Sequence, residues 1–163
     1  MEYGIQEDTL VILKPDSFWR HLDRQILGRI SALGLKTVAE RVLAGGENLS
    51  EDKWREFYHP VIGDRPPCLD GTSKYMAHGP VQVIHLRGAG AIPKVRQAVG
   101  ATRPWQAAAG TIRGDFWPGA QEANAPYRLK FQQPGDDQFV FNLIHASDSP
   151  RSFAREIRFF DLK

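Results

Sequence analysis

The clearest hydrophobic pattern in the chain is a continuous apolar run close to its beginning. Residues 9–13 (TLVIL) are apolar or β-branched, and Lys14, Pro15 and Asp16 stop the run. A short apolar run bounded by turn residues is typical of a strand that is buried on both faces. Less continuous apolar segments predict three more strands, at 35–43, 80–86 and 142–145.

Apolar residues at helical spacing separate these strands. Between Trp19 and Leu33 they recur at steps of three and four, which predicts a single helix that ends near Gly34. Ser149 and Pro150 are the residue types preferred at a helix N-cap and at the first helical position, so a last helix begins there. Further helices are predicted at 51–58, at about 69–77 and at 91–99.

The order of these elements predicts the fold class. Strand, helix, strand, helices, strand, helix, loop, strand and helix follow one another, which is the order of a ferredoxin-like split βαβ unit. We therefore expect an α+β fold with an antiparallel sheet and helices on one of its faces. The 163 residues suffice for one core, and no repeat or linker interrupts them, so a single domain over 1–163 is expected.

Composition and charge narrow the classes of function. Apolar residues make up 42% and charged residues 25%, as in a globular protein. The 21 basic and 19 acidic residues leave a net charge of +2, so no specific nucleic-acid binding is expected. The single cysteine, Cys68, excludes an internal disulfide and a cysteine-based zinc cluster, and it fits a reducing compartment, most simply the cytoplasm. Residues 1–8 contain no apolar segment, so no secretory signal is expected there, and no apolar run is long enough to cross a membrane.

One histidine stands at a position suited to chemistry. His145 lies where the last predicted strand ends, and Ser147 and the start of the last helix follow it. Glu156 lies inside that helix, near enough along the chain to reach one ring nitrogen. A carboxylate that holds the proton of one nitrogen leaves the other to act as a nucleophile. The alternative interpretation is a structural, hydrogen-bonded histidine with Glu156 in solvent.

Basic side chains near the ends of elements form a second candidate set. Lys14 ends the first strand, Arg96 lies within a predicted helix, and Arg113 lies in a glycine-flanked loop. Guanidinium and ammonium groups suit phosphate oxygens, and the hydroxyl of Thr102 adds a donor. Together with Arg103, these side chains would bind a polyphosphate if the fold brings them together. Taken separately, each is an ordinary surface residue.

Five segments of the chain, in order, resemble the nucleoside diphosphate kinase family. The TIRGDF loop at 111–116 and the histidine segment NLIHASDS at 142–149 are the most specific of them. The resemblance covers residues 8–116 and 140–160 to within a few positions. The other three segments are TLVILKPD at 9–16, KYMAHGP at 74–80 and VGATRP at 99–104.

The resemblance implies an enzyme whose substrates are ATP and other nucleoside triphosphates and diphosphates. The γ-phosphoryl group would pass through a phosphohistidine at His145 in a ping-pong cycle, with tolerance of different bases. Mg²⁺ would be the cofactor, carried by the nucleotide phosphates rather than by a protein metal site. By the same resemblance, Glu156 and Ser147 would orient His145, Tyr58 would meet Lys14, Asn142 would contact the ribose, and Lys14, Arg96, Thr102 and Arg113 would hold the phosphates.

Several positions depart from the family pattern. Ala146 stands where the family has glycine, which would cost about 1 kcal/mol or more if that backbone needs a positive φ. Pro67 follows an Asp-Arg-Pro segment where the family has a phenylalanine that stacks on the base, and Arg103 stands where asparagine is common. These departures leave an alternative open: a non-catalytic, nucleotide-binding regulatory module on the same fold.

The largest departure is an insertion at 117–141. Alternating residues flank the turn-forming segment 134–137 (PGDD), which predicts a β-hairpin. In the family, the loop before this insertion helps to build trimeric contacts within hexamers, so the insertion would affect hexamer assembly. We therefore expect a homo-oligomer, and a dimer or tetramer is expected at least as much as a hexamer. Aromatic residues of the insertion need burial against the neighbouring loop, the nucleotide cleft or another subunit, and these are Trp117, Phe131, Phe139 and Phe141.

Overall fold

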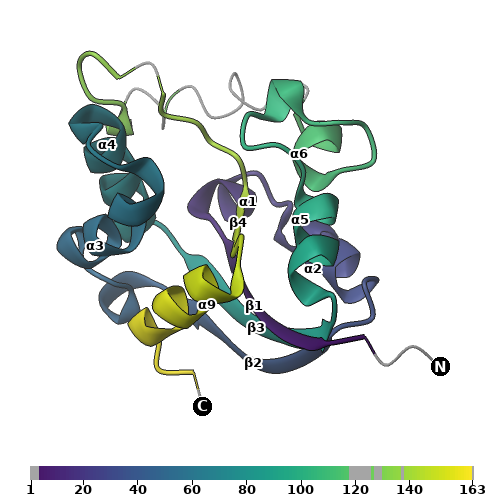
Figure 1. The fold of residues 1–163 in the computed structure, drawn as a ribbon. Helices are drawn as coiled ribbons and strands as arrows, with labels where there is room; N and C mark the ends of the chain where they lie inside the picture. Colours follow the sequence, from purple (N-terminus) through teal and green to yellow (C-terminus); the bar gives the residue numbers. More distant parts are fainter. Residues whose placement is uncertain (1–3, 118–125, 127–129, 137, 163) are drawn as a thin grey trace.

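The computed structural model describes residues 4–117, 126, 130–136 and 138–162. Its strands are β1 (Gln6–Leu13), β2 (Lys36–Leu43), β3 (Val81–Ala89) and β4 (Ile144–Ala146). They form one antiparallel sheet with the order β2-β3-β1-β4 (Figure 1). This order, with helices between the strands, confirms the ferredoxin-like α+β fold.

The segment between β1 and β2 forms two helices where the apolar spacing predicted one. They are α1 (Pro15–Trp19) and α2 (Asp23–Ser31), and His21 between them has a φ of +55°, which no right-handed helix can contain.

The predicted helix at 51–58 continues to Ile62, and the one at 69–77 begins at Pro66. The remaining helices are α3 (Glu51–Ile62), α4 (Pro66–Ala77), α5 (Ala91–Val99), α6 (Ile112–Asp115) and α9 (Pro150–Glu156), with 3-10 turns at Gly45–Glu47, Pro104–Gln106 and Ile157–Phe159.

Helices cover both faces of the sheet, so the prediction of one covered face was wrong (Figure 1). Leu10 and Ile12 of β1 pack in a core cluster with residues of α3 and α4. Val11 and Leu13 point the other way and pack with residues of α2 and α5. Because successive residues of a strand face opposite sides, the continuous apolar run of β1 is explained by burial on both faces.

The last strand is shorter than predicted. β4 begins at Ile144 rather than at Asn142, because Leu143 has a φ of +71°, far from the extended region. The strand then pairs with β1 so that His145 lies opposite Ile12. His145 is therefore held by the sheet register rather than by a loose strand end.

The described part of the insertion does not form the predicted hairpin. The turn at Pro134–Gly135 is present, but the described residues on either side of it belong to no strand. Oδ1 of Asp136 accepts hydrogen bonds from the amides of Gln138 (2.8 Å) and Phe139 (2.9 Å). These amides are therefore satisfied locally and need no partner strand. Residues 127–129 of the predicted first arm lie outside the described residues.

Three aromatic residues of the insertion lie in the domain's own core. Phe131 stacks on Trp19 with ring centroids 5.9 Å apart and an interplanar angle of 5°, and Tyr75 of α4 contacts all three rings. The prediction of loop, cleft or subunit contacts was therefore wrong for them, although Trp117 does pack on the neighbouring loop at Trp105. The three buried residues, each 1% exposed, are Phe131, Phe139 and Phe141.

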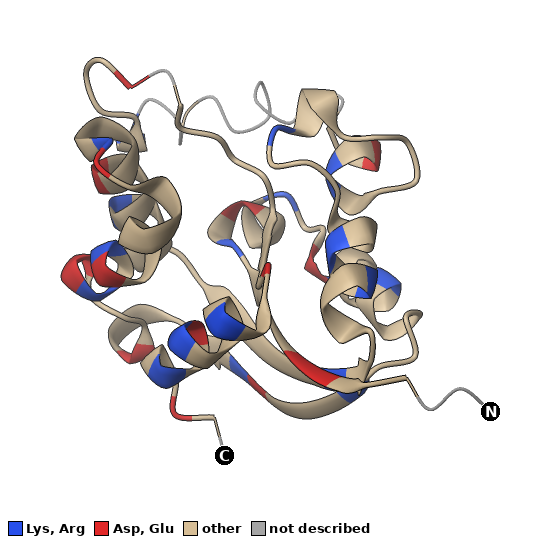
Figure 2. Ribbon diagram, in the orientation of Figure 1, with Lys and Arg blue, Asp and Glu red and all other residues tan. Residues whose placement is uncertain are grey.

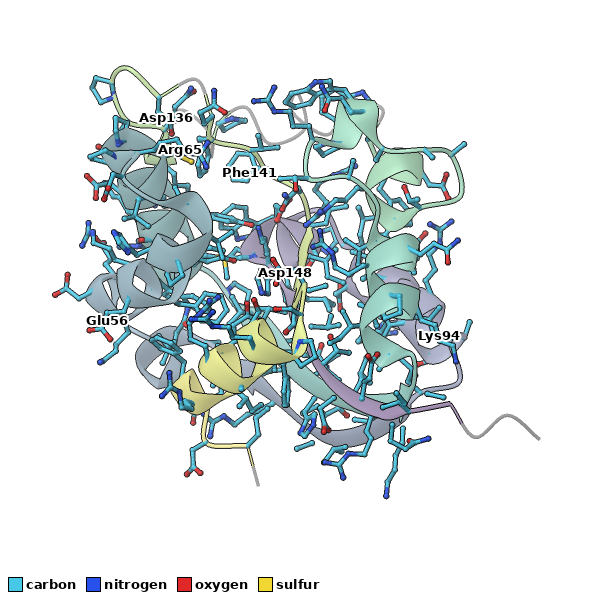
Figure 3. The ribbon with its side chains drawn as sticks, viewed as in Figure 1. Glu56, Arg65, Lys94, Asp136, Phe141 and Asp148 are labelled. Carbon is cyan, nitrogen blue, oxygen red and sulfur yellow. The ribbon has the colours of Figure 1, made fainter. Side chains whose placement is uncertain are left out.

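Charged residues are distributed over the whole ribbon. Figure 2 shows basic and acidic residues interspersed on the same helices, in line with the even balance of charge. In Figure 3, Glu56 and Lys94 point outward on opposite sides, whereas Asp148 lies between the two helical layers. Over the residues that the structure describes, no helix is both long and apolar enough to cross a membrane.

Candidate active site: a basic pocket around His145

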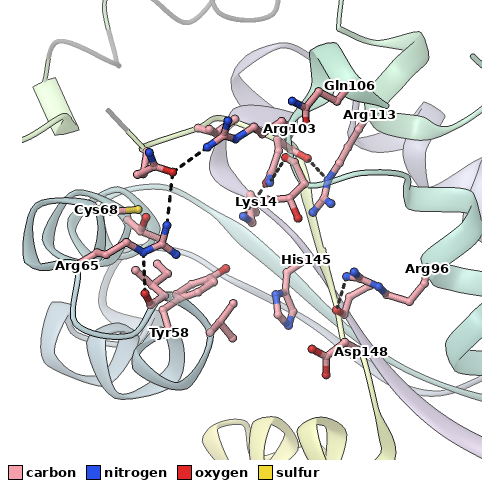
Figure 4. A pocket seen from close by; sticks show the side chains of 18 of the residues that line it. Lys14, Tyr58, Arg65, Cys68, Arg96, Arg103, Gln106, Arg113, His145 and Asp148 are labelled. Carbon is pink, nitrogen blue, oxygen red and sulfur yellow. Dashed lines mark hydrogen bonds between the residues drawn. The ribbon is translucent and has the colours of Figure 1, made fainter. Parts of the chain in front are cut away.

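A pocket of about 580 Å³ opens between the two helical layers, and Lys14, which follows β1, and His145 of β4 are among its lining residues (Figure 4). This volume is in the range of small-molecule and cofactor sites. Five basic side chains but only two carboxylates line it, so its charge suits an anionic ligand. Among the residues expected from the sequence, the pocket is lined by Lys14, Tyr58, Arg96, Thr102, Arg113, Asn142, His145 and Glu156, whereas Ser147 lies behind it.

His145 is a buried imidazole beside a carboxylate. Its Nε2 lies 3.1 Å from Oε2 of Glu156, close enough for an ion pair, although the angles are not those of a hydrogen bond. Burial lowers the pKa of His145 below its usual value, and the nearby Glu156 only partly opposes this. The neutral, nucleophilic form of the ring is therefore favoured near pH 7.

Ser147 holds both the carboxylate and the strand. Its hydroxyl donates to Oε2 of Glu156 over 2.7 Å, so it fixes the oxygen that faces the histidine. The same hydroxyl accepts from the amide of Leu10 (3.2 Å), and the Ser147 amide donates to the Leu10 carbonyl (3.0 Å). Because Ser149 caps α9 by accepting from the amide of Ser152, the helix that carries Glu156 starts at a defined place.

Lys14 and Asn142 form one hydrogen-bonded unit at the wall of the pocket. Nζ of Lys14 donates to Oδ1 of Asn142 over 2.7 Å, and Nδ2 of Asn142 donates to the Thr102 carbonyl over 3.0 Å. Burial, with a smaller contribution from the nearby Arg113, lowers the pKa of Lys14 to about 7. An anionic ligand beside this ammonium would raise the pKa again.

Arg113 ties the pocket to the backbone that precedes His145. Its guanidinium donates to the carbonyls of Asn142 (3.2 Å), Gly100 (3.1 Å) and Ile144 (2.5 Å). Burial lowers the pKa of Arg113 to about 10, so it stays charged at neutral pH. Thr111 caps the short helix α6 by accepting from the Gly114 amide, and this local turn places the arginine inward.

Tyr58 and Arg96 complete the surroundings of His145. The buried Tyr58 hydroxyl has no hydrogen-bond partner among the described residues, and its ring lies edge-on to the imidazole at 5.9 Å. Burial raises the pKa of Tyr58, so the phenol stays neutral. Arg96 is exposed, and its Nη1 lies 3.5 Å from the Ala146 carbonyl. Both side chains therefore have donors that can turn to a ligand.

The structure shows the surroundings of two residues that depart from the family pattern, Ala146 and Pro67. Ala146 lies inside β4, and the only described non-glycine residues with a positive φ are His21 and Leu143, so the methyl group strains no backbone. Pro67 is half-buried near the start of α4 and is not among the residues that line the described pocket, whereas Cys68 is. The start of α4 therefore contributes Cys68 to the pocket, and no aromatic ring of a described residue stands there to stack on a base.

Sequence reasoning missed some residues of the site. Asp16 accepts hydrogen bonds that fix the segment before His145, and its place in the KPD segment was the available signal. Gln138 reaches the pocket from the insertion, where no local pattern pointed to it. Arg103, treated above as a possible phosphate ligand, lines the same end of the pocket as Gln138.

The comparison with protein families decides the identity. A family model described as nucleoside diphosphate kinase matches residues 7–161, which is nearly the whole chain. The chain belongs to the nucleoside diphosphate kinase family. Its activity is that of the family, the phosphotransfer between nucleoside triphosphates and diphosphates, and a non-catalytic module is not favoured.

Individual relatives agree with this assignment. Nucleoside diphosphate kinases of Roseiflexus castenholzii and Pyrobaculum aerophilum are 38% and 35% identical, over 94% of this chain and 87% and 94% of theirs. Among solved structures, a transition-state mimic of the Borrelia burgdorferi enzyme with vanadate and ADP has a TM-score of 0.76 at 29% identity, covering 95% of this chain and 86% of that one. The Halobacterium salinarum enzyme in complex with CDP has a TM-score of 0.73 at 32% identity, covering 98% and 92%.

Proposed function

We propose that His145 is the residue that carries the phosphoryl group in this nucleoside diphosphate kinase. The observation that carries the proposal is the contact of Nε2 with Glu156 inside a basic pocket, because it leaves Nδ1 as the nucleophile. The Nδ1 lone pair attacks the γ-phosphorus, the bond to the bridging β,γ-oxygen breaks, and the diphosphate leaves. In the second half-reaction, a terminal oxygen of an acceptor diphosphate attacks the same phosphorus, the P–N bond breaks, and neutral His145 returns.

The basic side chains are proposed to hold the phosphates during both half-reactions. Phosphoryl transfer depends mainly on alignment and on neutralising the charge of the equatorial oxygens. A guanidinium has five N–H donors, so the three backbone bonds of Arg113 leave two for phosphate. Arg96 on α5, Lys14 after β1 and the Thr102 hydroxyl after α5 would supply the other donors.

Asn142 and Tyr58 are proposed to fix the sugar and the inner phosphates. Asn142 is held by Lys14 and by the Thr102 carbonyl, so its amide presents a defined edge to ribose hydroxyls. The Tyr58 hydroxyl, which has no partner among the described residues, would donate to a phosphate oxygen or to the sugar. Nζ of Lys14 lies 5.6 Å from the centre of the Tyr58 ring, which keeps the ammonium and the phenol at one end of the ligand.

The divalent metal that the family uses is proposed to be Mg²⁺ and to arrive with the nucleotide. Among the described residues, no group of three His, Cys, Asp or Glu side chains could hold a metal ion, and Glu156 is engaged with Ser147. Such a donor set fits an ion that keeps its waters and is carried by phosphate oxygens, and the exposed carboxylate of Asp148, which lines the pocket, would accept hydrogen bonds from such waters. When bound, Mg²⁺ would neutralise charge on the transferred group.

The remaining expectations concern the wider setting. ATP and other nucleoside triphosphates and diphosphates are the proposed partners, and the cytoplasm, where nucleotides and reduced thiols occur, is the proposed location.

Homo-oligomerisation is supported by the edge strand β2, where Val38 and Val42 are 40% and 48% exposed. A second subunit that covered this edge would bury both side chains.

The test is an intact-mass measurement of the protein after mixing with Mg·ATP and again after adding excess GDP. One phosphoryl adduct that forms and then disappears as GTP appears is the expected result. His145→Gln should form no adduct, whereas His85→Gln, which changes a half-buried histidine paired with Asp8 outside the pocket, should behave like the wild type. An adduct of unchanged yield in His145→Gln would overturn the proposal.

A further inference from the structure

The end of the pocket away from His145 holds a bridge of three side chains. Oε1 of Gln138 accepts from Nη2 of Arg103 (2.9 Å) and from Nη1 of Arg65 (3.5 Å), as Figure 4 shows. Arg103 follows α5 and Arg65 precedes α4, so the bridge connects the two helical layers. Gln138 comes from the insertion, and Oδ1 of Asp136 accepts from its amide.

Apolar side chains also line this pocket. Val61, Ile62 and Val140 are among its lining residues, and in the view of Figure 4 Lys14 lies between Arg103 and His145. Nε of Arg65 donates to the Ile62 carbonyl over 2.9 Å, which fixes the arginine against this apolar wall. A nucleotide with its phosphates at His145 would extend its base toward Arg65 and Arg103, which lie away from His145 in Figure 4.

The two guanidinium groups converge on Oε1 of Gln138, which holds Arg103 in place and leaves its other N–H groups for a further acceptor. Among the described residues, Nη2 is the atom of Arg103 that donates a hydrogen bond, so most donors of its fork are left for a ligand. The edge of guanine that carries O6 and N7 offers two acceptors and is the preferred partner of such a fork. Adenine presents an amino donor in place of O6, which would face the N–H groups of the arginine.

We propose that Arg103 reads the base edge and makes this enzyme favour 6-oxopurine nucleotides, with Gln138 as the residue that positions Arg103. The proposal rests on the proposed site at His145, since it requires the phosphates at that end. It is narrower than the tolerance of different bases that the resemblance implied. It also gives the insertion a role in substrate selection, because Gln138 belongs to it.

The test measures kcat/KM for GDP, IDP and ADP as acceptors with one common donor. IDP has the O6 and N7 of GDP but lacks the 2-amino group, so GDP and IDP should both exceed ADP by about tenfold, the size of one bidentate contact. Arg103→Lys keeps the charge but loses the fork, so it should bring the GDP-to-ADP ratio close to one. Gln138→Ala should lower the same ratio by a smaller factor.

Controls separate this proposal from the proposed function. Arg24→Asn changes an exposed arginine on α2, outside the pocket, and should leave all three values unchanged. If wild-type protein forms the phosphoryl adduct but GDP, IDP and ADP are used equally, the base-reading proposal alone fails. An equal loss for all three acceptors in Arg103→Lys and Gln138→Ala would also overturn it, because phosphate binding or folding would then explain the effect. Failure of the wild type to form the adduct is instead a failure of the proposed function.

Discussion

The backbone amide of Leu143 donates a hydrogen bond over 3.1 Å to Oδ2 of Asp16, a residue 127 positions away in the sequence. Leu143 has a φ of +71°, a conformation that costs a non-glycine residue about 1–2 kcal/mol. Oδ1 of Asp16 accepts from the Tyr75 hydroxyl over 2.5 Å. Asp16 therefore holds a strained residue in place two positions before His145 and ties it to α4.

Replacing Asp16 should loosen this connection. Asp16→Ala leaves the Leu143 amide and the Tyr75 hydroxyl without their acceptor, so the free energy of unfolding should fall by about 2 kcal/mol or more. The rate of phosphoryl uptake by His145 should fall as well. Urea denaturation and rapid-quench mass spectrometry measure the two effects. Tyr75→Phe removes only one of the two bonds and should cost less, so equal losses in both variants would contradict the assignment.

Glu156→Gln tests how the carboxylate acts on His145. Glu156 raises the pKa of the histidine against the effect of burial, so its removal should lower that pKa further. The acid limb of the pH profile for phosphoryl uptake should therefore move to lower pH. The maximal rate should fall by about tenfold or more, because Nε2 no longer faces a carboxylate that stabilises positive charge on the ring. Glu47→Gln, an exposed change in a 3-10 turn, is the control, and an unmoved acid limb in Glu156→Gln would exclude the positioning role.

Lys14 makes nucleotide binding a proton-linked event. Because burial lowers the pKa of Lys14 to about 7, a good part of the free protein has a neutral amine at pH 8. Phosphates beside Nζ should raise that pKa, so ADP binding should take up a fraction of a proton at pH 8. Calorimetry in buffers with different ionisation enthalpies measures this uptake. His145→Gln should retain the uptake and Lys14→Met should lose it; retention in Lys14→Met would assign the proton to another group.

The lowered pKa of Lys14 also makes the stability of the nucleotide-free protein depend on pH. The pKa of Lys14 is lowered on folding, so between about pH 7 and pH 10 the unfolded chain binds more protons than the folded chain. Stability from this group should therefore rise with pH across that window, by at most about 1.4 kcal/mol per pH unit. The free energy of unfolding of Lys14→Met, compared with that of the wild type from pH 7 to 9.5, should lack this rise. If the free energies of unfolding of the two proteins change in parallel with pH, the pKa of Lys14 is not lowered on folding.

Much of the sheet could be predicted because its signals are local. The apolar run of β1 and the periodicity of α5 each carry their own pattern, and Ser149 caps α9 as its residue type predicts. What the sequence did not reveal depends on contacts between distant residues. The break at His21 and the start of β4 come from positive φ angles at non-glycine residues, which no local pattern announces.

Some residues of the site could likewise be predicted from local sequence signals, and others depend on tertiary packing. His145, Lys14 and Arg113 stand at element ends or in loops that the sequence marks, so their candidacy could be stated in advance. Gln138 could not be found, because its place depends on how the insertion packs. The alternation around Pro134 and Gly135 resembled a hairpin, but burial of aromatic rings and the side chain of Asp136 decide the described conformation.

The stacking of Phe131 on Trp19 provides the last prediction, which concerns the insertion. Phe131 is 1% exposed and contacts Trp19, Tyr75 and His78, so the ring is part of the main core rather than of a detachable loop. Phe131→Ala should therefore lower the free energy of unfolding by about 3–5 kcal/mol. Lys130→Ala, an exposed change next to it, should cost less than about 0.5 kcal/mol. Urea denaturation of both variants measures the difference, and a loss below 1 kcal/mol in Phe131→Ala would mean that the insertion packs only loosely on the domain.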